Sequence, residues 1–360
     1  MPSLVSAPEA VTVDWLDSVL HESGDLAAAH VAGFGARSVG TGQVGENVRF
    51  TLEYDSEAQG APASVVIKFP SLDAKSRATA VAQGIYRKEV SFYREIAATV
   101  GIRTPRCLFA DIDLASQDFV LVMEDLAPAL QGDQIRGCSV EQASIALDEL
   151  AKLHAPRWGD PKLAEVSWLG RREPGGGQLL QAIYQSVWPG FVERFGSRLD
   201  AEQLALAEQL GAGLAAWVDG GEGPLTVTHG DYRLDNMLFG SGEAAFPLAV
   251  VDWQTVGHGV GTADAAYFLG AGLPLEVRRR EERALMREYH RKLEAAGVKG
   301  YDWDACWLDY RRYAFSGVLM AVVASMIVGE SERGDEMFAA MATRHTAHAL
   351  DHDSLEFLRR

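Results

Sequence analysis

Three closely spaced glycines in residues 40–45, GTGQVG, and the segment after them restrict the fold most. Gly40, Gly42 and Gly45 fit the G-x-G-x-x-G pattern, in which the backbone approaches a phosphate closely. A dinucleotide-binding fold requires a helix directly after the glycines, because the helix N-terminus holds the pyrophosphate. Residues 48–54, VRFTLEY, instead alternate apolar and polar side chains and predict a half-buried strand. The sequence therefore argues against a dinucleotide site here.

A second strand is predicted directly after this one. Turn residues at 55–62, DSEAQGAP, precede the apolar run SVVIKF at 64–69, which Pro70 ends. The glycines thus lead into a β-hairpin. Two interpretations stay open: a plain glycine-rich hairpin turn, and a glycine loop that covers nucleotide phosphates, as in protein kinases.

The next segment predicts one long helix over residues 74–100. Glu89 falls in line with its apolar stripe, which contains Phe92, Tyr93, Ile96 and Val100. A carboxylate there needs a buried partner, unless it lies at the solvated margin of the stripe. Two more strands are predicted near residues 106–111 and 118–123.

Helices dominate from Ser139 onward. Ser139 and Gln142 form a capping-box pattern that opens a helix running to His154. Further helices are predicted over residues 276–297 and 303–328. We therefore expect a β-rich lobe over residues 1–125 and a helical lobe over residues 126–360.

Residues 226–239, TVTHGDYRLDNMLF, carry the most informative polar pattern. A short β-run precedes the loop and another follows it, and the loop reads H-x-D-x-x-x-x-N from His229. This is the catalytic-loop pattern of kinases, in which the aspartate is the base and the asparagine is a metal ligand. Asp252 then ends the apolar strand LAVVD, where a carboxylate is well placed to hold Mg²⁺.

These segments resemble the aminoglycoside phosphotransferase and choline kinase family. HGDYRLDNMLF and VVDWQ resemble its two signature segments, and LAKLHAPRW at 150–158 resembles the end of its first large C-lobe helix. The resemblance extends over almost the whole chain from about residue 30. It implies a two-lobed, protein-kinase-like α+β fold, with an antiparallel sheet in the N-lobe and a mainly helical C-lobe. It also implies transfer of phosphate from ATP to a hydroxyl group of a small molecule.

The resemblance assigns the main roles position by position. Asp231 would accept the proton of the acceptor hydroxyl, and Asn236 and Asp252 would hold Mg²⁺. Lys68 would bind the α- and β-phosphates of ATP, with Glu89 as its ion-pair partner. This partner would explain the carboxylate on the apolar helix stripe.

The remaining roles concern the edges of the site. Arg233 would stabilise charge on the transferred phosphoryl group, or else serve as a bracing or exposed arginine. Glu124 and Leu126 would offer a backbone carbonyl and an amide to adenine. His229 would have a structural role, and Asp264 would brace the catalytic loop.

The acceptor is left open by the sequence. Trp253 and Gln254 follow Asp252 and no A-P-E segment follows, both of which disfavour protein substrates. Asn47 stands where a protein-kinase glycine loop has valine, a departure that concerns the glycine-loop contacts. Residues 252–270 look nearest to the ecdysteroid kinase-like and acyl-CoA-dehydrogenase-associated branches. An apolar lining from residues 303–328 would suit a partly apolar alcohol, although core packing explains it equally well. A catalytically silent nucleotide-binding regulatory module is the alternative function.

Composition and the length of the apolar runs argue against nucleic-acid-binding, disulfide-rich, zinc-binding and membrane-spanning proteins. A formal net charge of -17 disfavours a nucleic-acid surface. Three widely spaced cysteines indicate neither a disulfide framework nor a zinc site and fit the cytoplasm. The uncharged run at 314–329 is shorter than the roughly 20 residues of a membrane span, so we expect a buried helix. The oligomeric state is left open.

A histidine series near the C-terminus is the last candidate site. His345, His348 and His352 are spaced to share one helix face. They either bind a metal or form a solvated or partly packed helix end.

Overall fold

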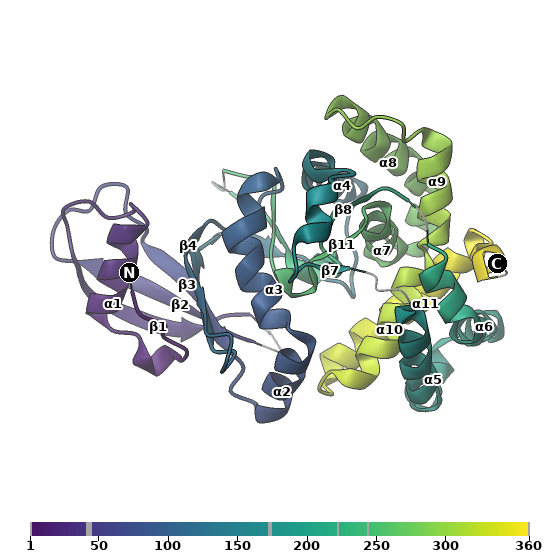
Figure 1. The fold of residues 1–360 in the computed structure, drawn as a ribbon, viewed down its shortest axis with the longest axis horizontal. Helices are drawn as coiled ribbons and strands as arrows, with labels where there is room; N and C mark the ends of the chain where they lie inside the picture. Colours follow the sequence, from purple (N-terminus) through teal and green to yellow (C-terminus); the bar gives the residue numbers. More distant parts are fainter. Residues whose placement is uncertain (1, 41–44, 172–174, 222, 243–244, 359–360) are drawn as a thin grey trace.

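The computed structural model describes residues 2–40, 45–171, 175–221, 223–242 and 245–358. Figure 1 shows a sheet-bearing lobe and a larger helical lobe, with the two termini at opposite ends of the molecule.

The N-lobe is built on one antiparallel sheet with the strand order β1-β2-β3-β5-β4. Its strands are β1 Val31–Ser38, β2 Gly45–Tyr54, β3 Ser64–Pro70, β4 Cys107–Ile112 and β5 Phe119–Glu124. The predicted strands are therefore confirmed, and the glycine segment does join two antiparallel strands. Helix α1, Val13–Glu22, packs its apolar side chains against one face of this sheet.

The predicted helix over residues 74–100 is wrong as a single element. It consists of α2 Ala74–Gln83, α3 Ile85–Ser91, a π-helical turn Phe92–Ile96 and a 3₁₀ turn Ala97–Thr99. Gly84 ends α2 in the left-handed conformation, with φ 63°, and its N–H bonds to the carbonyls of Ala80 and Val81. Glycine adopts this conformation without steric cost, so the chain changes direction there.

Eight longer helices are described in the C-lobe. They are α4 Val140–His154, α5 Gly176–Phe195, α6 Ala201–Asp219, α7 Thr262–Gly272, α8 Leu275–Ala295, α9 Trp303–Arg312, α10 Phe315–Ile327 and α11 Glu332–Asp351. The capping box of Ser139 and Gln142 is present at the start of α4. The single helix predicted over 303–328 is wrong, since the chain turns at Tyr313 between α9 and α10. Neither glycine nor proline stands there, and the buried Tyr313 ring packs in the core.

The uncharged run at 314–329 forms α10. Its inward side chains, Phe315, Val318, Ala321 and Val322, are buried, which confirms a core helix. Within the described parts of the chain, no helix combines the length and the apolar character needed to cross a membrane.

Two small three-stranded sheets are formed by strands that follow the N-lobe sheet in the chain. One has the order β10-β9-β6, with β6 Leu130–Gln131, β9 Met237–Phe239 and β10 Leu248–Val250. The other has the order β7-β11-β8, with β7 Gly170–Arg171, β8 Leu225–Thr228 and β11 Gly257–Val260. The loop at 229–236 lies between β8 and β9, and Asp252 follows β10 by two residues. The lobe boundary predicted after residue 125 falls between β5 and β6.

Candidate active site

The loop that contains Asp231 is anchored on helix α7 by Asp264. The Asp264 carboxylate accepts the backbone N–H of His229 at 2.7 Å and that of Gly230 at 3.0 Å. Gly230 has φ 81°, and a β-carbon on it would lie 2.6 Å from the carbonyl oxygen of Thr255. The loop therefore requires glycine there, and Asp264 braces the loop as the family resemblance implied.

His229 links this loop to the strand that leads to Asp252. The backbone N–H of Asp231 points at His229 Nδ1 at 3.2 Å, so this nitrogen accepts. Nε2 then carries the hydrogen and donates to the carbonyl of Val251 at 3.1 Å. A second bond joins the Val251 N–H to the carbonyl of Asn236 at 3.0 Å. These contacts give His229 a structural role in fixing the loop.

The carboxylate of Asp231 has different partners on its two oxygens. Oδ2 accepts from Asn236 Nδ2 at 3.0 Å and from Arg233 Nε at 3.0 Å. Oδ1 accepts from the hydroxyl of Tyr267 at 2.8 Å. The side chain keeps 20% of its surface exposed, so a ligand can still reach it. A carboxylate held this firmly suits a base whose orientation must match the acceptor.

Arg233 lies between two carboxylates of the same loop. Besides Asp231 it bonds to Asp235 through Nη1 at 2.7 Å, and Arg333 of α11 approaches Asp235 at 3.0 Å. Burial lowers the pKa of Arg233, but Asp231 and the other acidic groups outweigh this effect and raise it. The sequence reasoning missed Asp235 and Arg333. A second acidic side chain inside the loop pattern was the available signal for Asp235.

Lys68 brings the two lobes together in a buried ion-pair cluster. Its Nζ lies 2.7–2.8 Å from the carboxylate oxygens of Glu89 on α3 and 3.2 Å from Oδ1 of Asp252. Burial lowers the pKa of Lys68, yet the two carboxylates reverse this and raise it above its ordinary value. Burial raises the pKa of Asp252, but Lys68 overcomes this and lowers it. The buried partner that Glu89 required is thus Lys68.

The backbone at Asp252 is in the left-handed region, with φ 67° and ψ 71°. A non-glycine residue rarely adopts it, and such strain is frequent at functional sites. The following Trp253 is fully buried and stacks on Phe92, with ring centroids 3.8 Å apart. This stacking joins the Asp252 segment to the π-helical turn that directly follows α3, the helix that carries Glu89.

Asn236 and Asp252 have the donor atoms that Mg²⁺ prefers. The Asn236 amide nitrogen is engaged with Asp231, which leaves its carbonyl oxygen available to a cation. The Asp252 side chain is 37% exposed although Lys68 contacts one of its oxygens. Amide and carboxylate oxygens are hard ligands, so this pair fits the predicted cation.

The three glycines predicted to contact the nucleotide differ in their surroundings. Gly40 has φ 78° and lies beyond the end of β1, whereas Gly42 lies outside the described residues. A β-carbon on Gly45 would lie 3.1 Å from Cε of Lys68 and 3.2 Å from the carbonyl of Phe69. Gly45 therefore permits the close approach of its backbone to the lysine.

Glu124 and Leu126 lie where β5 leaves the sheet. The Glu124 side chain is engaged by Arg103 at 2.7 and 2.8 Å, and its N–H donates to the carbonyl of Arg106. Its side chain thus supports the sheet edge. The adenine contacts of the Glu124 carbonyl and the Leu126 amide stay a prediction.

The C-terminal histidines are buried rather than solvated, which corrects one of the two expectations for them. His345 and His348 are at most 1% exposed and His352 is 8% exposed. Nitrogens of His348 and His352 and an oxygen of Glu282 lie within 4.8 Å of one another. However, the buried Arg278 donates to the same oxygen at 2.8 Å. A cation there would meet a repulsion of about 4 kcal/mol per unit charge at 4 Å, which disfavours a metal.

The buried histidines predict a pH-dependent stability. Burial lowers the pKa of His345 to about 3 and that of His348 well below its ordinary value, and Arg278 adds to both effects. The unfolded state therefore binds more protons below pH 6.5, so the stability present above this pH is lost as the pH falls. We expect the free energy of unfolding to decrease by about 2 kcal/mol per histidine from pH 7 to pH 5.

Urea unfolding at both pH values measures this effect, and the double variant His345→Leu/His348→Leu is the comparison. Other groups that face these rings, including Arg344, Tyr310 and Glu282, are unchanged in it. An equal loss of stability in the wild type and the double variant would show that His345 and His348 do not cause the pH dependence.

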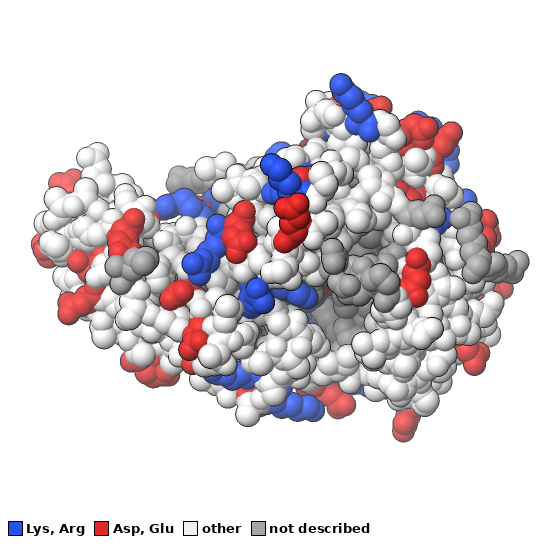
Figure 2. Space-filling model, viewed as in Figure 1, with Lys and Arg blue, Asp and Glu red and all other residues white. Residues whose placement is uncertain are grey.

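Figure 2 shows one face of the molecule, with acidic and basic side chains interspersed over both lobes. The surface is hollowed where the lobes meet.

Comparison with known proteins identifies the relatives of this chain. Residues 57–306, more than half of the chain, match the sequence model of the phosphotransferase enzyme family. No curated protein sequence matches significantly. Choline kinase from Cryptosporidium parvum has a similar structure, with a TM-score of 0.55, 10% identity and 89% of each chain covered.

A thermostable mutant of aminoglycoside phosphotransferase APH(4)-Ia is also similar. Its TM-score is 0.51 and its identity 16%, with 90% of this chain and 95% of that chain covered. That protein was solved with AMP-PNP and hygromycin B. At these identities the similarity concerns the fold alone. The predicted family and the two-lobed kinase-like fold are confirmed, whereas the branch within the family stays a prediction.

Proposed function

Because the chain belongs to the phosphotransferase enzyme family, we propose that it transfers the γ-phosphoryl group of ATP to a small-molecule hydroxyl with the help of Mg²⁺. The observation that carries this proposal is the cluster of Lys68, Glu89 and Asp252, which joins the lobes beside the firmly held Asp231. The complex of a structural relative with AMP-PNP is consistent with ATP as the donor.

Each side chain has a defined part in the proposed reaction. The acceptor hydroxyl gives its proton to Asp231, its oxygen bonds to the γ-phosphorus, and the bond to the β-phosphate breaks to release ADP. Lys68 binds the α- and β-phosphates, and Glu89 orients it. Asn236 and Asp252 would hold Mg²⁺, and a cation bound there would offset negative charge on the phosphates. The chain therefore acts mainly through positioning and electrostatics.

Arg233 is the proposed stabiliser of charge on the transferred group. Its two loop carboxylates fix the guanidinium beside the base. Since those contacts also neutralise it, bracing of the loop is the competing role.

The apolar side chains of helix α10 do not identify the class of acceptor. Phe315, Val318 and Val322 face the core, so their character is explained by packing. Sterol or lipid alcohols, amino alcohols and sugars remain the compounds to test. The cytoplasmic location also stays a prediction, which rests on three free cysteines.

The test is a screen of purified protein with ATP, MgCl₂ and a library of these alcohols. ADP release and a phosphorylated product detected by mass spectrometry, both lost in Asp231→Ala, would support the proposal. Intact Mg-ATP binding without turnover of any acceptor would favour the silent regulatory module. Thermal stabilisation by NAD but not by ATP would contradict a kinase.

A Mg²⁺ dependence follows from the oxygen ligands. We expect EDTA to abolish turnover and MgCl₂ to restore it. In Asp252→Asn the Mg²⁺ concentration for half-maximal rate rises by at least about 10-fold, because a neutral amide replaces a charged ligand. Asp160→Asn, which changes a partly exposed aspartate paired with Arg157, is the matched control. An unchanged Mg²⁺ requirement in Asp252→Asn would exclude this ligand.

A further inference from the structure

Helix α7 contacts the catalytic loop at two points, and only the first was expected. Asp264 binds the start of the loop, and Tyr267 lies three residues later on the same face of the helix. The Tyr267 hydroxyl donates to Oδ1 of Asp231 at 2.8 Å. The same helix therefore sets both the backbone of the loop and the carboxylate that it presents.

The Tyr267 ring is held in place by His345 of α11. The two rings stack with centroids 5.3 Å apart and an interplanar angle of 12°. Two glycines make room for the imidazole: a β-carbon on Gly317 of α10 would lie 2.0 Å from it, and one on Gly270 of α7 would lie 2.6 Å away. Three helices thus restrict the direction of the phenol.

The protonation states suit a fixed hydrogen bond. Burial, followed by the charge of Asp231, raises the pKa of Tyr267 well above its usual value, so the phenol keeps its proton. The low pKa of His345 makes its ring neutral, and it brings no charge to the site. The protonated phenol can therefore donate a lasting hydrogen bond to the Asp231 carboxylate.

We propose that Tyr267 is a positioning residue, which holds the Asp231 carboxylate turned toward the acceptor hydroxyl. The inference rests on the proposed phosphoryl transfer. Tyr267 itself exchanges no proton in the reaction. Arg233 and Asn236 engage only Oδ2, so Tyr267 is the described side chain that restrains Oδ1.

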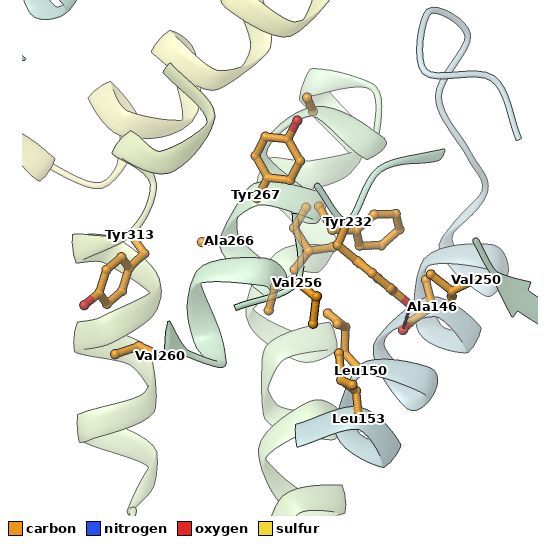
Figure 3. Close-up of a cluster of buried hydrophobic side chains, with 14 of the residues drawn as sticks. Ala146, Leu150, Leu153, Tyr232, Val250, Val256, Val260, Ala266, Tyr267 and Tyr313 are labelled. Carbon is orange, nitrogen blue, oxygen red and sulfur yellow. Dashed lines mark hydrogen bonds between the residues drawn. The ribbon is translucent and has the colours of Figure 1, made fainter. Parts of the chain in front are cut away.

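Tyr267→Phe tests this role, and Tyr184→Phe is its matched control. Tyr184 is also buried, but its hydroxyl donates to the carbonyl of Ala207 at 2.8 Å, outside the catalytic loop. Figure 3 shows the hydroxyl of Tyr232, a residue of the loop itself, directed toward Ala146 and the Tyr267 hydroxyl directed away from it. Tyr267→Phe and Tyr184→Phe each remove one buried phenolic hydroxyl, and only the first removes a contact with Asp231.

We expect kcat to fall about 10-fold or more in Tyr267→Phe, the range for a lost hydrogen bond to a charged group. The KM for ATP stays unchanged, because the variant leaves Lys68, Glu89 and Asp252 in place. Tyr184→Phe changes kcat by no more than about 2-fold. An unchanged kcat in Tyr267→Phe, or the same loss of kcat in both variants, would overturn the positioning role.

A spectroscopic measurement separates this inference from the proposed function. In ultraviolet resonance Raman difference spectra, we expect the tyrosine band removed by Tyr267→Phe to be that of a strong donor and to change in Asp231→Ala. If the wild type phosphorylates no acceptor, the proposed function fails, and with it a catalytic role for Tyr267. A weak-donor band would show that the contact itself is absent.

Discussion

Asp231→Ala is expected to lower kcat by about 10²–10⁴-fold, the usual contribution of a general base. The change removes the proposed proton acceptor and also the carboxylate that aligns Arg233 and Asn236. The KM for ATP should change little, because Lys68, the proposed phosphate-binding residue, keeps Glu89 and Asp252 as partners. Steady-state kinetics with a hydroxyl acceptor found in the screen measures both parameters.

Asp160→Ala is the matched control for this variant. Its side chain is 24% exposed, close to the value for Asp231, and it pairs with an arginine as well. Because Asp231→Ala leaves the Tyr267 hydroxyl without its acceptor, a loss of about 1–3 kcal/mol in unfolding free energy is expected. Activity must therefore be measured well below the melting temperature. If Asp231→Ala retains more than a tenth of the wild-type kcat, Asp231 is not the base.

Lys68→Met is expected to lower the free energy of unfolding by about 3–5 kcal/mol, since it leaves the buried carboxylate of Glu89 without its cation. The Glu89 side chain is 2% exposed, so water cannot screen its charge, whereas that of Asp252 is 37% exposed. The variant should also lose ATP turnover. Urea unfolding, together with ATP titration, measures the two effects separately.

The double variant Lys68→Met/Glu89→Leu shows whether the loss comes from an unpaired charge. We expect it to recover most of the stability but none of the activity, because apolar residues can replace a buried ion pair without large cost. Arg94→Met is the surface control: its pair with Asp111 is about half exposed and should contribute less than about 1 kcal/mol. Equal instability of the single and double variants would contradict the pairing argument.

Much of the fold could be predicted from local patterns. The alternation of residues 48–54 indicated a strand, and the capping box of Ser139 placed the start of α4. The helix prediction failed where the chain interrupts a helix, at Gly84 and at Tyr313. Gly84 was a readable signal, since glycine adopts φ 63° easily, but the turn at Tyr313 has no local signal and results from packing.

The candidate site was predicted unevenly for a similar reason. Asp231 and Asn236 are five residues apart, so their hydrogen bond is almost local and the loop pattern indicated it. Lys68 and Asp252 are 184 residues apart, and only the family resemblance linked them. The partnership of Tyr267 with Asp231 was missed, because an aromatic residue on a helix more often indicates core packing.

The sequence by itself determined which chemical groups the loop offers, the strand-and-helix order, and the glycines at which the chain can turn. These properties depend on residue type and on spacing within a few turns, which are local. The tertiary structure decided which groups are neighbours. It places Lys68 beside two carboxylates and Tyr267 beside Asp231, and it buries the histidines of α11 in the protein interior. Desolvation and Coulomb energies depend on burial and on distances between remote segments, so they exist only once the helices have packed.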